Sequence, residues 1–271
     1  MTAREEIKER AIDDSLLDER ILKNVQHQRI DLVQWIFDRI KARPGDCILE
    51  LCSGTGNQTL KLLDLIGENG KVLAVDISEP ALKKLKDKVG ADLERRLITL
   101  QVSIDHLKDA LAKMKSIDEN FDLIFCAYGL YYSERPEDIL GEMLHWLASD
   151  GRIVIVGPFG PNNGLLFNFL ERSGVKIPDY VRYTSQDFME KVVLPFATRN
   201  FTKTNVYTLI NPVVWESQED VFHYWKNSTF FDEEKKEIIK ERLERFIIKN
   251  NEFINEKWVM MVEMTNRIPE K

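Results

Sequence analysis

The sequence has few cysteines, no long basic run and no long apolar run. Its three cysteines, Cys47, Cys52 and Cys126, form no Cys-x-x-Cys pair, so the pattern favours free thiols over a disulfide framework or a metal site. No apolar stretch approaches the ~20 residues that cross a bilayer, and the charged residues 1–14 differ from a signal peptide. We therefore expect a cytoplasmic protein with no metal and no membrane span.

The charge balance also narrows the class of partner. The 271 residues carry a net charge of −7, with 44% hydrophobic and 31% charged residues. Binding to duplex nucleic acid needs a concentrated basic face, which this composition does not favour. The chain is long enough to bury a substantial core, so we expect a globular protein. The acidic charge favours a small-molecule partner.

Short apolar segments alternate with segments of helical periodicity along the first 160 residues. The expected strands are residues 47–51, 71–75, 97–102, 121–126 and 152–156. Ser78 and Pro80 are typical of a helix start, while Thr184 or Ser185 is expected to cap a later helix. This alternation predicts an α/β fold with a parallel sheet, whose ligand edge lies at the carboxyl ends of the strands.

A glycine turn follows the first expected strand and precedes a helix over about Gln58–Ile66. Gly54 and Gly56 carry no Cβ, so a ligand can approach the backbone closely there. A phosphate-binding loop is excluded because no lysine follows the turn. A dinucleotide fingerprint is disfavoured because Thr59 stands where a third glycine or alanine is needed. The turn therefore predicts a nucleoside-containing cofactor of another kind.

The run Glu50-Leu51-Cys52-Ser53-Gly54-Thr55-Gly56, followed twenty residues after Gly56 by Asp76, resembles the class I methyltransferase family. The likeness spans roughly residues 45–160 and is nearest to the UbiE/BioC-like small-molecule group. Cys52 replaces the first glycine of the usual pattern. The resemblance implies a Rossmann-like, seven-stranded, mostly parallel sheet that binds S-adenosyl-L-methionine and releases S-adenosyl-L-homocysteine.

The resemblance also implies the cofactor site. Asp76 would accept hydrogen bonds from the ribose diol, and Ile77 would pack on adenine. Either Ser103 or Asp105 would read the base, and this choice is open. Cys52 and Cys126 also have a simple interpretation as packed small side chains. The implied cofactor-binding residues are Glu50, Cys52, Ser53, Gly54, Gly56, Asn57, Asp76, Ile77, Ser103, Ile104 and Cys126.

The remaining sequence is expected to cover the acceptor. We divide the chain into N-terminal helices over 1–42 and a methyltransferase domain over 43–271, with cap insertions at about 157–182 and 211–256. In the resembled fold both insertions follow strands whose carboxyl ends lie at the ligand edge. We therefore expect these segments to line the acceptor pocket.

Three residues are candidates for catalytic roles. Tyr128 and Tyr132 follow the fourth expected strand, and His223 lies in the aromatic part of the second insertion. A hydroxyl or carbon acid needs a nearby base, which a histidine can supply. Aromatic packing for the tyrosines and a structural role for His223 are the competing interpretations.

The sequence thus predicts a methyltransferase that uses S-adenosylmethionine and acts on a small, partly apolar metabolite. Methylation at oxygen, nitrogen or carbon is left open, as is the oligomeric state, a homodimer included. An RNA or protein methyltransferase and a non-catalytic binder of the same cofactor are the alternatives.

Overall fold

The computed structural model describes residues 3–90, 93, 95–114 and 120–269. The other residues belong to the predicted ranges 1–42 and 43–271 but lie outside the described residues. Within the described chain, no helix combines the length and low charge that crossing a membrane requires.

The strands form one seven-stranded sheet with the order β3-β2-β1-β4-β5-β7-β6. This arrangement confirms the predicted α/β fold of the class I methyltransferase type. In chain order the strands are β1 (Cys47–Leu51), β2 (Lys71–Asp76), β3 (Leu97–Gln101), β4 (Phe121–Ala127), β5 (Leu147–Pro158), β6 (Phe201–Trp215) and β7 (Phe253–Arg267).

The first five strands are parallel, as their alternation with helices predicts. β1 pairs with β2 and β4, so that Leu51 lies opposite Val75 on one side and Cys126 on the other. β2 pairs with β3, and β4 pairs with β5. Runs of apolar residues are typical of strands covered on both faces. The carboxyl ends of these parallel strands meet at one edge of the sheet, where the glycine turn lies.

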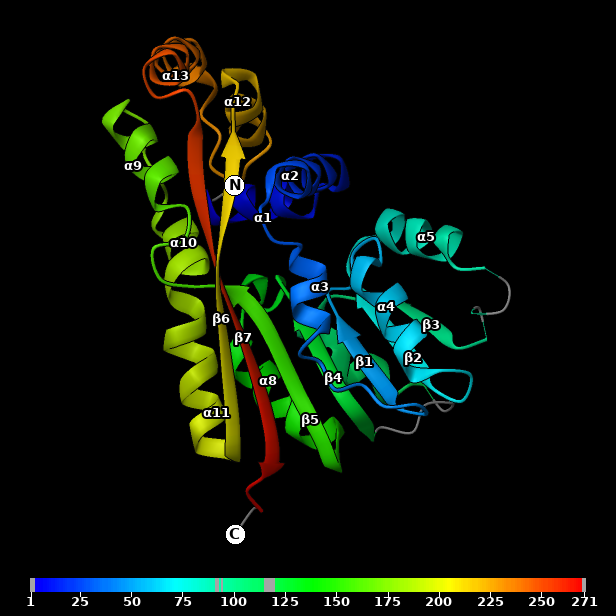
Figure 1. The fold of residues 1–271 in the computed structure, drawn as a ribbon. Coiled ribbons are helices and arrows are strands. Elements are labelled where there is room, and N and C mark those ends of the chain that lie inside the picture. Colours follow the sequence, from blue (N-terminus) through cyan, green and yellow to red (C-terminus); the bar gives the residue numbers. More distant parts are fainter. Residues whose placement is uncertain (1–2, 91–92, 94, 115–119, 270–271) are drawn as a thin grey trace. The chain divides into compact units, whose positions relative to one another are not determined.

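The strands β6 and β7 run in opposite directions (Figure 1). The Ile268 amide donates to the Asn200 carbonyl at 2.8 Å, and Asn205 Nδ2 donates to Glu263 Oε2 at 2.8 Å. As the residue number rises on one strand it falls on its partner, which defines an antiparallel pair. The sheet is therefore mixed and mostly parallel.

The helices follow the strands, and their local signals explain several boundaries. The Ser78 hydroxyl accepts a hydrogen bond from the Ala81 amide at 3.2 Å, and Pro80 lies in the first turn, so the predicted helix start is confirmed. The described helices are α1 (Ala3–Ile12), α2 (Asp14–His27), α3 (Leu32–Phe37), α4 (Asn57–Ile66), α5 (Glu79–Lys88), α7 (Leu107–Leu111), α8 (Pro136–Trp146), α9 (Gly164–Arg172), α10 (Asp179–Arg182), α11 (Leu194–Asn200), α12 (Gln218–Lys226) and α13 (Lys236–Asn250).

The predicted helix start at Thr184 or Ser185 is wrong. The helical segment already begins at Asp179, after the extended Pro178, and continues through wider π-helical turns at 183–187 and 189–193 into α11. Proline sets the start because its fixed φ suits the residue before a helix. The Thr184 hydroxyl donates to the Val181 carbonyl inside the helix instead of capping it.

The chain divides into two compact units. Unit 1 comprises Met1–Leu32, Pro158–Phe188 and Thr208–Val259, and unit 2 comprises Val33–Gly157, Met189–Tyr207 and Met260–Lys271. Unit 2 contains the five parallel strands, with α4 against β2 and α5 against β2 and β3. The predicted insertions at about 157–182 and 211–256 belong to unit 1, apart from Gly157.

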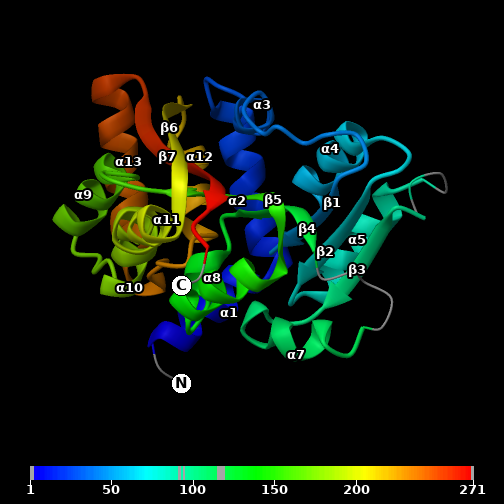
Figure 2. The ribbon, with the colours of Figure 1, turned by 90° about the horizontal axis from the view of Figure 1, so that it is seen from below.

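Unit 1 has an aromatic core of its own. Trp215 and Trp225 are fully buried there, together with aliphatic side chains of α9, α12 and α13. The helices α12 and α13 lie side by side (Figure 1 and Figure 2).

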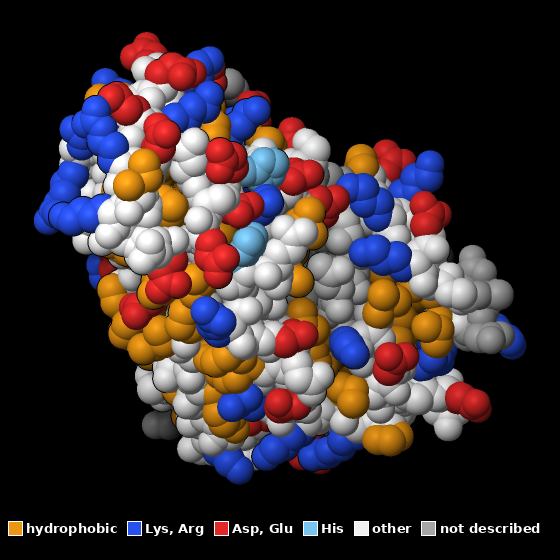
Figure 3. Space-filling model, turned by 45° about the horizontal axis from the view of Figure 1, so that its top comes forward, with side chains coloured by type: hydrophobic (Ala, Val, Ile, Leu, Met, Phe, Trp, Pro, Cys, Tyr) orange, Lys and Arg blue, Asp and Glu red, His pale blue; other side chains and the backbone are white. Residues whose placement is uncertain are grey.

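On the face shown in Figure 3, Lys and Arg side chains alternate with Asp and Glu side chains instead of forming one large basic field.

Candidate cofactor site at the carboxyl ends of the strands

The glycine turn after β1 is held by its own backbone. The Ser53 amide donates to the Val75 carbonyl at 3.0 Å, and the Gly56 amide donates to the Ser53 carbonyl at 3.1 Å. Cys52, Gly54 and Gly56 all have a positive φ, of 57°, 53° and 83°. Helix α4 starts at once after Gly56, with no side-chain cap, so its first amides remain available to a ligand.

The two glycines of the turn have different environments. A Cβ on Gly56 would lie 2.2 Å from Leu85 Cδ1, so Gly56 allows α5 to pack against the turn. A Cβ on Gly54 would meet no atom within 4 Å. The open space is therefore beside Gly54, and close approach of a ligand to the backbone is sterically allowed there.

Asp76 joins the end of β2 to this turn. Its Oδ2 accepts a hydrogen bond from the Gly54 amide at 2.7 Å, and its Oδ1 accepts one from the Ser78 amide at 2.9 Å. These contacts fix the orientation of the carboxylate at the strand end. A carboxylate oxygen can accept more than one hydrogen bond, so a carboxylate at this position suits a ligand hydroxyl.

Glu50 is a buried carboxyl at the end of β1. It is 2% exposed, and within the described residues its Oε2 has no hydrogen-bond partner. Burial raises the pKa of Glu50 to about 8, and the Asp76 carboxylate contributes to this rise. The nearby Thr59 hydroxyl opposes the rise, although its oxygen makes no hydrogen bond of regular geometry. A buried, unpaired carboxylate oxygen is costly unless a ligand supplies a donor or a positive charge.

Cys52 and Cys126 lie close together across β1 and β4. The Cys126 thiol, followed by burial, raises the pKa of Cys52 well above its usual value. A Cβ on Gly129 would lie 2.4 Å from Cys52 Sγ, so the chain after β4 packs directly on this thiol. A protonated, packed thiol forms part of the wall of the site and is a poor nucleophile.

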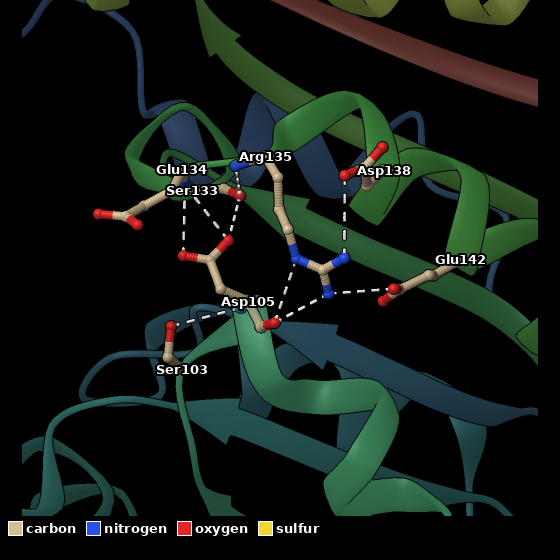
Figure 4. Close-up of polar contacts among 7 residues, drawn as sticks. All are labelled: Ser103, Asp105, Ser133, Glu134, Arg135, Asp138 and Glu142. Carbon is tan, nitrogen blue, oxygen red and sulfur yellow. Dashed lines mark hydrogen bonds and ion pairs between the residues drawn. The ribbon is translucent and has the colours of Figure 1, made fainter.

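The predicted adenine-reading segment is tied to the chain that follows β4 (Figure 4). The Asp105 carboxylate accepts a short hydrogen bond from the Ser133 hydroxyl and another from the Glu134 amide at 3.2 Å. Ser103 caps the short helix Ile104–His106 by accepting from the Asp105 amide at 3.3 Å. Both predicted base readers thus have protein partners, and the choice between them stays open.

Arg135 was missed by the sequence reasoning. Its Nη2 donates to the Asp105 carbonyl at 2.8 Å and to Glu142 Oε1 at 3.0 Å, which locks the segment after β3 to helix α8 (Figure 4). The available signal was an arginine immediately before Pro136, at the start of an expected helix. Its partner on another strand connection cannot be read from local sequence.

The remaining predicted cofactor residues border the same strand ends. Ile77 follows β2 and is 47% exposed, so its side chain is available to a flat ligand surface. Ile104 is buried, while Asn57 is exposed at the start of α4, where its Oδ1 accepts from Lys88 Nζ at 3.4 Å. The residues that the resemblance assigned to cofactor binding all belong to unit 2.

The three predicted catalytic residues fall in different units. Tyr128 directly follows β4 with a φ of 59°, and its amide donates to the Val156 carbonyl at 2.9 Å. Tyr132 lies in the short helix Leu130–Tyr132, with its ring centroid 4.7 Å from that of Tyr131. Both tyrosines belong to unit 2, whereas His223 belongs to unit 1. His223 Nε2 lies 2.7 Å from Glu19 Oε2 of α2, so its ring already has an acidic partner.

Comparison with known proteins decides the family. The sequence profile of the ubiE/COQ5 methyltransferase family matches residues 19–205. The chain belongs to the ubiE/COQ5 methyltransferase family. The predicted class I methyltransferase identity is confirmed. The matched range contains the glycine turn, Glu50 and Asp76.

Members of the ubiE/COQ5 family and solved structures give further context. The ubiquinone/menaquinone biosynthesis C-methyltransferase UbiE of Azotobacter vinelandii is 34% identical over 46% of this chain and 47% of its own. The demethylmenaquinone methyltransferase of Lactobacillus johnsonii is 28% identical over 53% of this chain and 61% of its own. The chain therefore spans only about half to three fifths of these relatives.

A similar fold occurs in phosphoethanolamine N-methyltransferase 2 of Haemonchus contortus, solved with phosphomonomethylethanolamine and S-adenosylhomocysteine. The TM-score is 0.57 at 11% identity, covering 98% of this chain and 60% of that one. At this identity the likeness concerns the fold alone.

Within the described residues there is also no group of three or more His, Cys, Asp or Glu side chains that could hold a metal ion.

Proposed function

We propose that this chain is a methyltransferase that uses S-adenosyl-L-methionine and acts on a small, partly apolar acceptor. The observation that carries the proposal is the set at the strand ends: a fixed Asp76 carboxylate, open space at Gly54 and an unpaired, buried Glu50 oxygen. Membership of the ubiE/COQ5 family supports the same conclusion.

The residues fit the chemical groups of this cofactor. S-adenosylmethionine supplies an electrophilic methyl group on a positively charged sulfonium. Asp76 is suited to accept from the ribose diol, because both of its oxygens are acceptors when ionised. Glu50 is suited to the cationic methionine end, because a positive charge would offset the cost of burying its carboxylate. The first amides of α4 are suited to an anionic group such as the methionine carboxylate.

The segments that bind the acceptor are part of the proposal. Methyl transfer is an in-line displacement, so the acceptor atom must be held close behind the methyl carbon with water excluded. We propose that the inserted segments at about 157–182 and 211–256, together with the N-terminal helices over 1–42, bind the acceptor. A structure with S-adenosylhomocysteine and an acceptor bound tests this assignment. Acceptor density contacted by no residue of 158–182 or 211–256 would refute it.

The names of the relatives indicate which acceptors to test first. Both relatives described above carry names from quinone biosynthesis, so aromatic ring acceptors of that kind are the first to test with methyl-labelled cofactor. An RNA or protein methyltransferase would transfer label to macromolecules instead, and a non-catalytic binder would bind the cofactor without any transfer. We place the protein in the cytoplasm, which its three free thiols favour.

Tyr128, Tyr132 and His223 remain the candidates for catalytic contact. Once an acceptor is known, His223→Ala should lower the turnover number if the imidazole acts as base, whereas exposed His145→Ala serves as the matched control. Tyr128→Phe and Tyr132→Phe test the two hydroxyls separately. Equal turnover in the His223 and His145 variants would assign His223 a structural role.

A further inference from the structure

A cavity in unit 1 lies between α9 and α13, which run side by side (Figure 1 and Figure 2). Its volume of about 500 Å³ is within the range of small-ligand sites. No carboxylate of the described residues lines it, although the protein as a whole has a net charge of −7. The lining side chains are aromatic, basic or amide groups, namely Phe169 of α9 and Arg242, Arg245, Phe246, Lys249 and Asn250 of α13.

Two phenylalanine rings form the apolar part of the cavity. The ring centroids of Phe169 and Phe246 lie 5.7 Å apart, with the ring planes at 84°. Both rings also contact the fully buried Phe253 of β7, at centroid distances of 5.6 Å and 5.1 Å. Because the core holds the two rings in place, they offer a preformed surface to a flat ligand ring.

Arg242 is held by the end of α9, and part of its guanidinium is unused. Its Nη1 donates to the Arg172 carbonyl at 2.6 Å and to the Ser173 hydroxyl oxygen at 3.2 Å. Its Nε and Nη2 groups donate to no acceptor among the described residues. These two groups form an edge of the guanidinium that matches two oxygens of a phosphate or a carboxylate.

Arg245 and Lys249 bring two further positive charges to the cavity. Arg245 Nη2 forms an exposed ion pair with Glu241, which uses one of its donor groups. Lys249 Nζ makes no hydrogen bond or ion pair within the part of the chain that the structure describes. Like charges on neighbouring turns of a helix repel one another and destabilise it. An anion in the cavity would relieve this repulsion.

We propose that this cavity binds a flat ring joined to a phosphate group. The ring rests on Phe169 and Phe246, and the phosphate lies among Arg242, Arg245 and Lys249. A phosphate is favoured because its several oxygens and its charge near −2 at neutral pH match three cations. The site needs no methyl donor, so the inference goes beyond the proposed function and is independent of it.

Titration calorimetry of the full chain with 1-naphthyl phosphate tests the site. We expect saturable binding of one equivalent, and much weaker binding of inorganic phosphate and of 1-naphthol, because each lacks one of the two parts. Lys249→Met should lower the affinity for 1-naphthyl phosphate by about tenfold or more, as the loss of a hydrogen bond between charged groups does. Exposed Lys240→Met, also on α13 but outside the cavity, should leave the affinity unchanged.

The outcomes decide between this site and its alternatives. Absence of saturable binding, or equal affinity in the Lys249 and Lys240 variants, would overturn the inference. Equal affinity for inorganic phosphate and 1-naphthyl phosphate would remove the aromatic rings from the site and overturn it as well. The same holds if the protein sediments with phosphatidylglycerol vesicles through Lys249 but does not bind 1-naphthyl phosphate, which would make the surface a lipid contact.

A separate measurement keeps this inference apart from the proposed function. The affinity for S-adenosylmethionine should be the same in Lys249→Met as in the wild type, because the proposed cofactor residues belong to unit 2. Binding of 1-naphthyl phosphate by a wild-type protein that does not bind S-adenosylmethionine would support this site and reject the proposed function alone.

Discussion

The Asp76 carboxylate and the Gly54 amide are joined by a hydrogen bond of 2.7 Å that ties the end of β2 to the turn after β1. The acidic residue is therefore part of the turn as well as a candidate ligand for the cofactor. Removing the Asp76 carboxylate should loosen the glycine turn and remove two hydrogen-bond acceptors at once.

The first prediction concerns this carboxylate. Asp76→Ala should weaken S-adenosylmethionine binding by about 1–3 kcal/mol, because the ligand and the Gly54 amide would both lose an acceptor. Titration calorimetry measures the change, and the exposed Asp87→Ala on α5 is the control. Equal affinity in the Asp76 and Asp87 variants would reject the ribose assignment.

The two glycines of the turn should respond differently to substitution. Gly56→Ala should destabilise the fold by about 1–3 kcal/mol or more, because its Cβ would lie 2.2 Å from Leu85 Cδ1. Gly54→Ala should lower the free energy of unfolding by only about 1–2 kcal/mol, because alanine is strained in the left-handed backbone conformation. It should nevertheless abolish cofactor binding, because the added methyl group fills the open space. Urea unfolding and calorimetry on both variants measure this contrast. Normal cofactor binding by the Gly54→Ala variant would show that the cofactor does not approach the backbone at Gly54.

The raised pKa of Glu50 predicts a pH dependence of stability without ligand. The carboxyl titrates near its ordinary value of 4.5 in the unfolded chain and near 8 in the fold. Between these values the folded state retains a proton that the unfolded state releases. The free energy of unfolding should therefore fall as the pH rises from about 4.5 to about 8, by about 1.4 kcal/mol for each pKa unit at most.

The variant Glu50→Gln isolates this contribution. It should flatten the fall between about pH 5.5 and about pH 7.5 in urea unfolding, since a neutral amide does not titrate. The exposed Glu68→Gln should leave the slope of the wild type. A Glu50→Gln slope equal to that of the wild type would show that the carboxyl titrates normally in the fold.

A buried ion pair joins β5 to the start of β1, at the end of the strands that lies away from the glycine turn. Arg152 Nη2 of β5 lies 2.6 Å from Asp46 Oδ2, just before β1, and both side chains are under a tenth exposed. Arg152→Met should cost about 3–5 kcal/mol of folding free energy, because it leaves a buried carboxylate unpaired. Chemical denaturation measures the loss, with exposed Arg95→Met as control. A loss below about 1 kcal/mol would mean that the pair contributes little.

Much of the fold could be predicted because its signals are local. The parallel strands are short apolar runs, and Ser78 with Pro80 marks a helix start within three residues. The glycine turn and Asp76 are likewise separated by a single β–α–β unit, so the family resemblance was visible from spacing.

Other features depend on contacts between distant residues. The separate roles of Gly54 and Gly56 arise from Leu85, which belongs to another helix. The hydrogen bonds from Lys257 Nζ to Asn163 and Tyr224 join β7 to α9 and α12, and no sequence pattern near Lys257 predicts these partners. The helix start at Asp179 was misplaced because polar Thr184 and Ser185 resemble caps, although tertiary packing buries both.

Titration calorimetry with S-adenosylmethionine and S-adenosylhomocysteine tests the central claim most directly. We expect both to bind at one saturable site in the wild type, and both to bind more weakly in Asp76→Ala and not at all in Gly54→Ala. Absence of binding by both compounds to folded wild-type protein would contradict the account.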